Sequence, residues 1–93
     1  MLLLTATEEE VLQNKYTVTL YPNPVDDILT IRHDYDAQLR YADVYDLHGR
    51  LIKRYDMTQG KSNIHLNPLV KGLYVLRLEW EDDTTYTTKF IKL

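Results

Sequence analysis

The sequence contains no cysteine, which excludes disulfide bonds and thiolate metal sites but does not identify the compartment. Serine is almost as scarce: Ser62 is the only one, and the three histidines fall on separate predicted elements. Ser62 and His65 are three residues apart in a predicted strand, so their side chains point to opposite faces. The sequence therefore predicts no catalytic triad, no catalytic residue and no enzyme.

Long apolar runs and blocks of one charge are also missing. No run of about 18 uncharged apolar residues occurs, so the sequence predicts no membrane span. The 11 basic and 14 acidic residues are spread along the chain and give a net charge of -3, so no basic block is available to neutralise phosphates. We therefore expect no nucleic-acid partner. The apolar start Met1–Leu4 lacks a basic region and is followed by Glu8–Glu10, which is not the pattern of an export signal.

The composition is sufficient for one small folded domain. The chain has 93 residues, of which 44% are hydrophobic, including eight Tyr, one Trp and one Phe. This is too apolar for a disordered segment and too short for two domains. We expect a folded domain over residues 16–93. Residues 1–15 are predicted to form a linker or a short helix, because Thr7 and Glu10 fit a capping box ahead of Val11.

Hydrophobic periodicity predicts β-strands through the rest of the chain. Apolar and polar residues alternate, most clearly from Gly72 to Trp80, where the even-numbered side chains make one apolar face. In the last run, Tyr86 and Phe90 lie on one side and Ile91 on the other. Seven strands are predicted, near residues 16–20, 26–32, 40–46, 50–56, 62–66, 72–80 and 84–92.

Short polar turns separate these strands and favour antiparallel hairpins. The turn 46–49 places Gly49 where a positive φ is needed, and residues 81–84 make a second polar turn. Pro22 and Pro24 lack backbone donors, so their segment belongs at an edge or in a link between sheets. The expected fold class is all-β, with seven antiparallel strands in a two-sheet sandwich.

Acidic residues near histidine offer only a weak metal-binding pattern. His33 with Asp34 and Asp36, or Asp82 with Asp83, could be considered as ligands. These pairs lack the glycine turn and the distal glutamate of a calcium loop. The sequence therefore predicts solvated turns, with no metal ion and no other cofactor.

Four short segments follow one another along the predicted sandwich. They are Tyr21-Pro22-Asn23-Pro24, Gly49-Arg50-Leu51-Ile52, Lys71-Gly72-Leu73-Tyr74-Val75-Leu76 and the closing Lys89-Phe90-Ile91-Lys92-Leu93. In this order, and over residues 20–93, the chain closely resembles the C-terminal sorting domains of the type IX secretion system of Gram-negative bacteria. The resemblance implies an immunoglobulin-like seven-stranded sandwich, which agrees with the predicted strands.

The resemblance also implies a function as a non-catalytic sorting and targeting domain. Such domains form the last part of a larger exported protein and direct that cargo through the periplasm and across the outer membrane. They are recognised by the outer-membrane type IX translocon and by a sortase-like protease, which removes them upstream of the first segment and can join the cargo to surface lipopolysaccharide. The implied destination is the cell surface or the medium. Because the first segment starts at residue 21, we expect the cargo domain upstream in a longer protein, unless the chain is an unusually short reading frame.

The same comparison divides the matching residues into two groups. Tyr21, Pro22, Asn23, Pro24, Gly72 and Tyr74 are expected to be structural. Gly49, Arg50, Leu51, Lys89, Phe90, Ile91, Lys92 and Leu93 are the expected partner-binding residues. Arg50 could clamp a partner carboxylate or simply be a solvated charge, and the terminal strand could offer its edge to a receptor or complete the core. Free edges could also pair two copies of the chain into a homodimer.

A carbohydrate-binding or structural surface sandwich is the alternative function. Tyr41, Tyr45 and Tyr55 could share an exposed face and make a stacking platform for sugars. Aromatic residues in strands are more often core residues or cross-strand partners. Sugar binding predicts a coplanar exposed aromatic patch, whereas sorting predicts mostly buried aromatic residues and an accessible terminal edge.

Overall fold

A computed structural model describes residues 16–93, which contain seven β-strands. The prediction of a helix or linker over residues 1–15 lies outside the described residues. The strands are β1 (Val18–Tyr21), β2 (Ile28–His33), β3 (Leu39–Tyr45), β4 (Leu51–Asp56), β5 (Asn63–His65), β6 (Gly72–Trp80) and β7 (Thr85–Lys92). All seven predicted strands are confirmed, with bounds that differ by at most a few residues.

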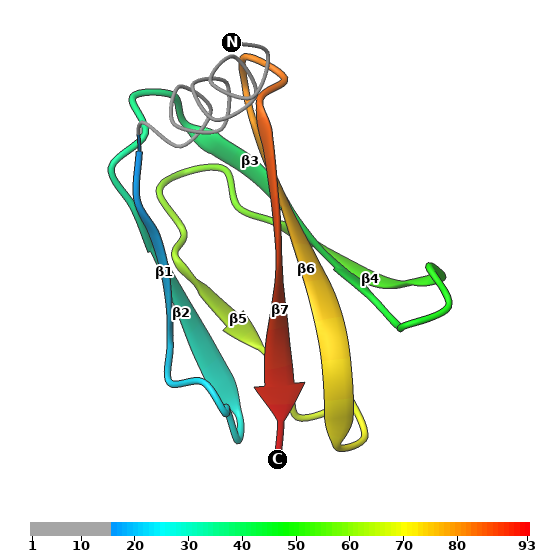
Figure 1. The fold of residues 1–93 in the computed structure, drawn as a ribbon. Helices are drawn as coiled ribbons and strands as arrows, with labels where there is room; N and C mark the ends of the chain where they lie inside the picture. Colours follow the sequence, from blue (N-terminus) through cyan, green and yellow to red (C-terminus); the bar gives the residue numbers. More distant parts are fainter. Residues whose placement is uncertain (1–15) are drawn as a thin grey trace, which may run out of the picture.

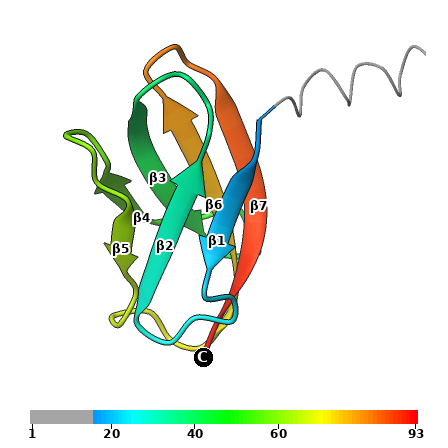
Figure 2. The same ribbon diagram turned by 90° about the vertical axis from the view of Figure 1, so that its left-hand side faces the viewer.

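The strands form two antiparallel sheets that face each other (Figure 1). One sheet has the order β1-β2-β5 and the other has the order β4-β3-β6-β7. Figure 2 shows the three-stranded sheet in front of the four-stranded one. The chain is therefore all-β over the described residues. Strand β4 and the turn before it project away from the three-stranded sheet (Figure 1).

The core lies between the sheets because each strand turns its apolar side inward. Along β6, Tyr74, Leu76, Leu78 and Trp80 are buried, as their spacing predicts. They meet Leu29 and Ile31 of β2, Ile64 of β5 and Phe90 of β7 in one cluster. Burying a large apolar side chain contributes about 1.5–3 kcal/mol, so this cluster is the main source of stability.

Turns hold the hairpins as their sequences predict. In the turn between β3 and β4, Gly49 has a φ of 82°, and its amide donates to the carbonyl of Asp46 at 3.1 Å. The carboxylate of Asp46 also accepts the amides of His48 and Arg50 at 2.9 and 3.0 Å. Glycine is favoured at this φ because it has no Cβ to clash with the backbone.

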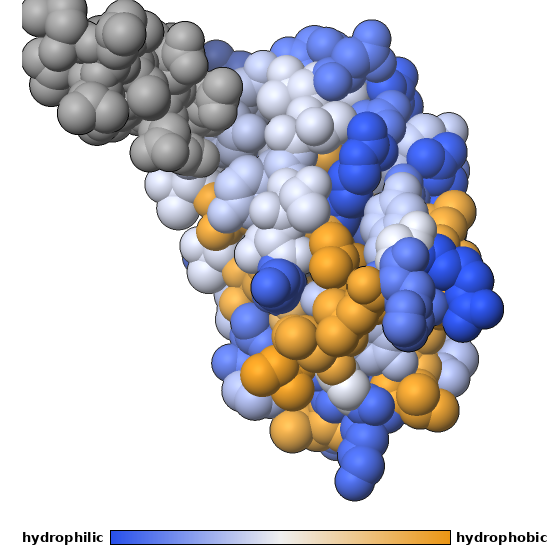
Figure 3. Space-filling view, turned by 45° about the vertical axis from the view of Figure 1, so that its right-hand side comes forward, coloured by the Kyte–Doolittle hydropathy of each residue, from blue (hydrophilic) through white to orange (hydrophobic). Residues whose placement is uncertain are grey.

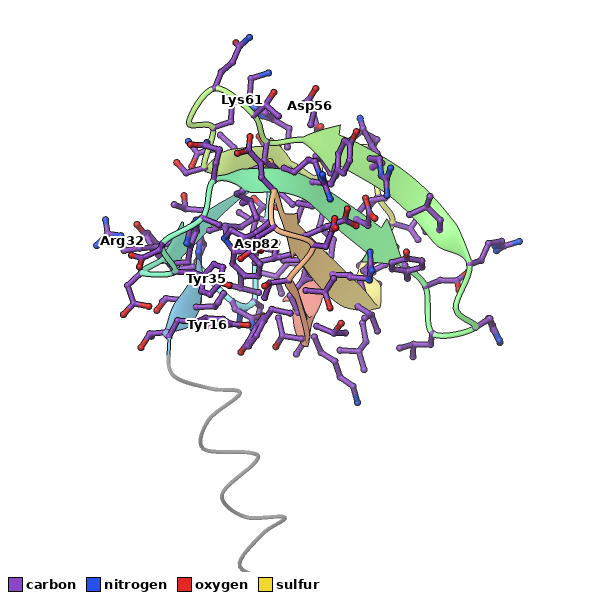
Figure 4. The ribbon with its side chains drawn as sticks, turned by 90° about the horizontal axis from the view of Figure 1, so that it is seen from above. Tyr16, Arg32, Tyr35, Asp56, Lys61 and Asp82 are labelled. Atoms are coloured by element: carbon purple, nitrogen blue, oxygen red, sulfur yellow. The ribbon has the colours of Figure 1, made fainter. Side chains whose placement is uncertain are left out.

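An aromatic cluster closes the end of the sandwich opposite the carboxyl terminus. The ring of Tyr16 lies 4.7 Å from Tyr35 and 5.5 Å from Trp80, between ring centroids. The hydroxyl of Tyr35 donates to Asp82 at 2.6 Å, and Figure 4 shows Tyr16, Tyr35 and Asp82 on the same side of the molecule. Trp80 is fully buried and directs its indole N–H to His33 at 3.4 Å. This end is therefore held by internal contacts.

Candidate functional site

The Tyr-Pro-Asn-Pro segment connects β1 to β2, and it also bonds to the terminal strand in the other sheet. The amide of Val25 donates to the carbonyl of Ile91, and the amide of Leu93 donates to the carbonyl of Val25, both at 2.8 Å. The side-chain oxygen of Asn23 accepts the amide of Ile91 at 3.0 Å. The first and last of the four segments are therefore joined by hydrogen bonds, and the link ties the two sheets together.

These bonds restrict strand addition along β7. Ile91 and Leu93 direct their backbone groups away from β6, and those named above already bond to the link. By alternation along the strand, Thr87 and Lys89 direct their backbone groups the same way. Within residues 16–93, no backbone partner outside the β6 ladder occurs for these two. The accessible edge thus lies upstream of the last three residues.

The terminal strand alternates between core and surface. Phe90 is 1% exposed and stacks on Tyr74 with ring centroids 5.7 Å apart. Lys92 is also buried, with its Nζ donating to the Leu93 carbonyl at 2.8 Å. Ile91 is 45% exposed. The side chains of Phe90 and Lys92, which sequence comparison places among the partner-binding residues, are therefore directed inward, and a partner reaches them only if this end opens.

The Gly-Arg-Leu-Ile segment lies at the opposite edge of the four-stranded sheet. Arg50 binds Asp46 through its Nε at 3.1 Å, and its side chain remains 78% exposed. Leu51 is 47% exposed and pairs with Tyr45 of β3. Hydrogen bonding by the Arg50 amide is the largest cause that lowers the pKa of Asp46, and the Arg50 guanidinium lowers it further. The turn therefore fixes the amide and the Nε of Arg50 and leaves most of the side chain in solvent.

The third segment begins β6 and supplies both faces of the sheet. Gly72 has a φ of 152° and pairs with Lys92. Tyr74 is buried, and its hydroxyl donates to the carbonyl of Val70 at 2.6 Å. Leu73 and Val75 point to the outer face, where Leu73 pairs with Ile91. The structure thus brings the first, third and last segments together, whereas the Gly-Arg-Leu-Ile segment lies on β4, at the other edge of the same sheet.

Exposed apolar side chains gather on the outer face of this sheet. Figure 3 shows an apolar patch over the lower part of the four-stranded sheet. The exposed members that the strands place there include Leu51, Leu73 and Ile91.

A buried charge on the same face escaped the sequence analysis. Asp43 is 1% exposed, and Arg54 bonds both of its carboxylate oxygens, at 2.9 and 3.0 Å. Arg77 lies 3.9 Å away, and the Arg54 guanidinium sits 4.0 Å from the centroid of the Tyr41 ring. Alternation along β3 places Asp43 on the face opposite Ala42 and Val44, but it does not predict that Asp43 is buried. Only the register, which places Asp43 between two arginines, reveals the ion pair.

The sugar platform considered for the alternative function does not form from the three tyrosines. Tyr41 and Tyr45 face outward, whereas Tyr55 pairs with buried Ala42 and packs against the core. The Tyr55 hydroxyl donates to the carbonyl of His65 at 2.6 Å. The three tyrosines do not share one face because pairing with β3 turns Tyr55 inward.

One member of each acidic pair considered as metal ligands has a hydrogen-bond partner inside the fold. Asp34 accepts the Thr17 amide at 2.6 Å, and Asp82 accepts the Tyr35 hydroxyl. Across residues 16–93, no group of three or more His, Cys, Asp or Glu side chains is arranged to hold a metal ion. In the same part of the chain, no helix is long and apolar enough to cross a membrane.

Comparison with known proteins gives a family match over most of the chain. The family model described as "Secretion system C-terminal sorting domain" matches residues 19–93. None of the curated proteins compared with the chain matches it.

Proposed function

Because the chain belongs to the family of type IX secretion C-terminal sorting domains, we propose that it is a non-catalytic domain recognised directly by the export machinery. The proposed partners are the outer-membrane translocon and a sortase-like protease. The domain would carry an upstream cargo through the periplasm to the cell surface or the medium. The single observation that carries this proposal is the family match over residues 19–93. Sorting signals of this family are in general not catalytic.

The strand order supports an immunoglobulin-like arrangement. In the constant-type immunoglobulin fold, one sheet contains strands A, B and E side by side and the other contains C, F and G. Here β1-β2-β5 occupies the first set and β3-β6-β7 the second, with β4 beside β3. We include this topology in the proposal.

The proposed contact residues are those of the terminal strand and the neighbouring hairpin that reach solvent. Lys89, Ile91 and Leu93 offer their side chains at one sheet edge, and Arg50 and Leu51 do so at the other. The exposed guanidinium of Arg50 is suited to binding a carboxylate because a guanidinium can donate two parallel hydrogen bonds. Gly49 sets the turn that presents it.

A secretion assay tests the proposal. The complete chain is fused behind an export signal and a reporter, in a host with a working type IX machine, and reporter on the outer surface is compared with reporter in the periplasm. Removing residues 89–93 should abolish export. Because this truncation also deletes Phe90 from the core, a variant with Lys89, Ile91 and Leu93 all replaced by serine is needed to change only outward side chains.

The matched control replaces Thr85 and Thr87, which face outward on the same strand, with serine. We expect export of the control and periplasmic retention of the variant at Lys89, Ile91 and Leu93, with both folded by circular dichroism. Periplasmic retention of the unaltered fusion, despite a folded domain, would remove the sorting function.

A further inference from the structure

Between the two proposed contact segments, a stepped row of apolar side chains crosses the outer face of the four-stranded sheet. The register places Leu51 of β4 opposite Tyr45 of β3, and Tyr45 opposite Val75 of β6. Leu73 lies two residues before Val75 on the same face and pairs with Ile91 of β7. We call the row Leu51–Tyr45–Val75–Leu73–Ile91 the outer apolar stripe. It joins segments that are about forty residues apart in sequence.

The outer apolar stripe is accessible to solvent, and its side chains also pack on the sheet. Leu51, Leu73 and Ile91 are 47%, 40% and 45% exposed, whereas Tyr45 and Val75 are half-buried. Four strands at a spacing of about 4.8 Å make the stripe about 14 Å wide. Clustered apolar side chains of this kind on a soluble domain mark interaction sites more often than scattered single ones do.

The charges beside the stripe are positive, although the chain has a net charge of -3. Lys89 pairs with Val75, and Arg77 and Arg54 occupy the next row of the sheet. The side chains of Arg54 and Arg77 are 46% and 36% exposed, whereas the carboxylate between them, Asp43, is 1% exposed. Arg77 also pairs with Glu79 at 3.2 Å, and the Glu79 side chain is 19% exposed, so solvent at this border meets more guanidinium than carboxylate.

We propose that the outer apolar stripe docks on an apolar protein surface that is bordered by carboxylates. Apolar contact would supply the central burial, and the surrounding cations would select an acidic rim and repel a basic one. This inference rests on the proposed sorting function and assigns its recognition to one continuous face. Tyr45, Leu73 and Val75 are added to the contact residues by this assignment.

The export assay can test the stripe with variants of matched exposure. Leu73→Glu places a carboxylate in the stripe, and Leu73→Lys removes the same apolar contact with the opposite charge. Ile28→Glu is the control because Ile28 is also 40% exposed but belongs to β2 in the other sheet. We expect export to fall about tenfold for Leu73→Glu, less for Leu73→Lys, and not at all for Ile28→Glu.

A second pair of variants separates the face from the strand edge. Lys89→Glu should reduce export whereas Lys89→Arg should not. Thr87→Pro removes an amide that points away from β6, so it blocks strand addition and leaves the stripe intact. All variants are at exposed positions, and their unfolding temperatures should stay within about 4 °C of the parent.

Each result has a definite meaning. Equal export of Leu73→Glu and Ile28→Glu, with the parent exported, would overturn the stripe while the sorting function stands. Equal losses for Leu73→Glu and Leu73→Lys would overturn the acidic rim. Loss with Thr87→Pro alone would replace face docking by strand addition at β7. Failure of the parent itself would remove the sorting function and this inference with it.

Discussion

Replacing Phe90 and Ile91 one at a time should separate folding from recognition within a single strand. The two residues are adjacent in sequence, yet Phe90 is 1% exposed and Ile91 is 45% exposed. Phe90 also stacks on Tyr74 between the sheets. Phe90→Ala should therefore lower the free energy of unfolding by about 3–5 kcal/mol, the range for deleting a buried aromatic side chain. Ile91→Ala should cost only about 1 kcal/mol, because nearly half of that side chain is already in water.

Urea unfolding of the complete chain, followed by circular dichroism, measures this difference. With an m-value of about 1.3 kcal/mol per M, a loss of about 4 kcal/mol lowers the urea midpoint by about 3 M. Since domains are stable by only about 5–15 kcal/mol, Phe90→Ala should lose a large fraction of the free energy of unfolding. Ile91→Ala should shift the midpoint by less than about 1 M and remain fully folded.

The export phenotypes should show the complementary pattern. Phe90→Ala should lose export only in proportion to its unfolded fraction, and Phe90→Leu, which keeps apolar volume, should restore much of it. Ile91→Ala should lose export while folded. Similar midpoint shifts for Phe90→Ala and Ile91→Ala, or export that follows stability in both, would refute the division of the terminal strand into inward structural and outward recognition residues.

Three further changes test single contacts. Tyr74→Phe should cost about 1 kcal/mol by deleting the hydrogen bond to the Val70 carbonyl, whereas Tyr74→Ala should cost about 3–5 kcal/mol in urea unfolding; equal costs would contradict the assigned burial. The folded-state pKa of Asp46 is lowered, so its stabilisation is present above about pH 4 and is lost as pH falls through that pKa. The gap in unfolding temperature between the parent and Asp46→Asn should therefore narrow as the pH falls below about 4 and through the lowered pKa, and a gap independent of pH would contradict the assignment. Asn23→Ala should speed hydrogen exchange at the Ile91 amide, measured by NMR, and unchanged exchange would show that this bond is not protective.

The strands could be predicted from sequence because alternation is a local property. The run from Gly72 to Trp80 shows this best, since each even-numbered side chain from Tyr74 is buried and each odd-numbered one is more exposed. The polar turn before Arg50 could also be predicted, because a positive φ at Gly49 favours glycine over other residues. These features require only neighbours in sequence.

Register and pairing partners could not be predicted in the same way. Alternation assigns Asp43 a face but does not reveal that Arg54 and Arg77 flank it. For the same reason, sequence could not show that Tyr55 sits on the opposite face from Tyr41. The bonds from Val25 to the terminal strand were also hidden, because they connect residues more than sixty positions apart.

The position of the four segments explains how one short sequence can serve both folding and recognition. Strand alternation buries Phe90 in the core and leaves Ile91 exposed to solvent, so the proposed contact residue and the core residue do not compete for space. The link through Val25 holds the backbone of the last residues, which keeps the outward side chains in register with Leu73. A partner that binds this face would therefore bind a surface that forms only after both sheets have assembled. Recognition of the outer face would accordingly discriminate folded domains from unfolded chains, since an unfolded chain carries the same residues but not their alignment.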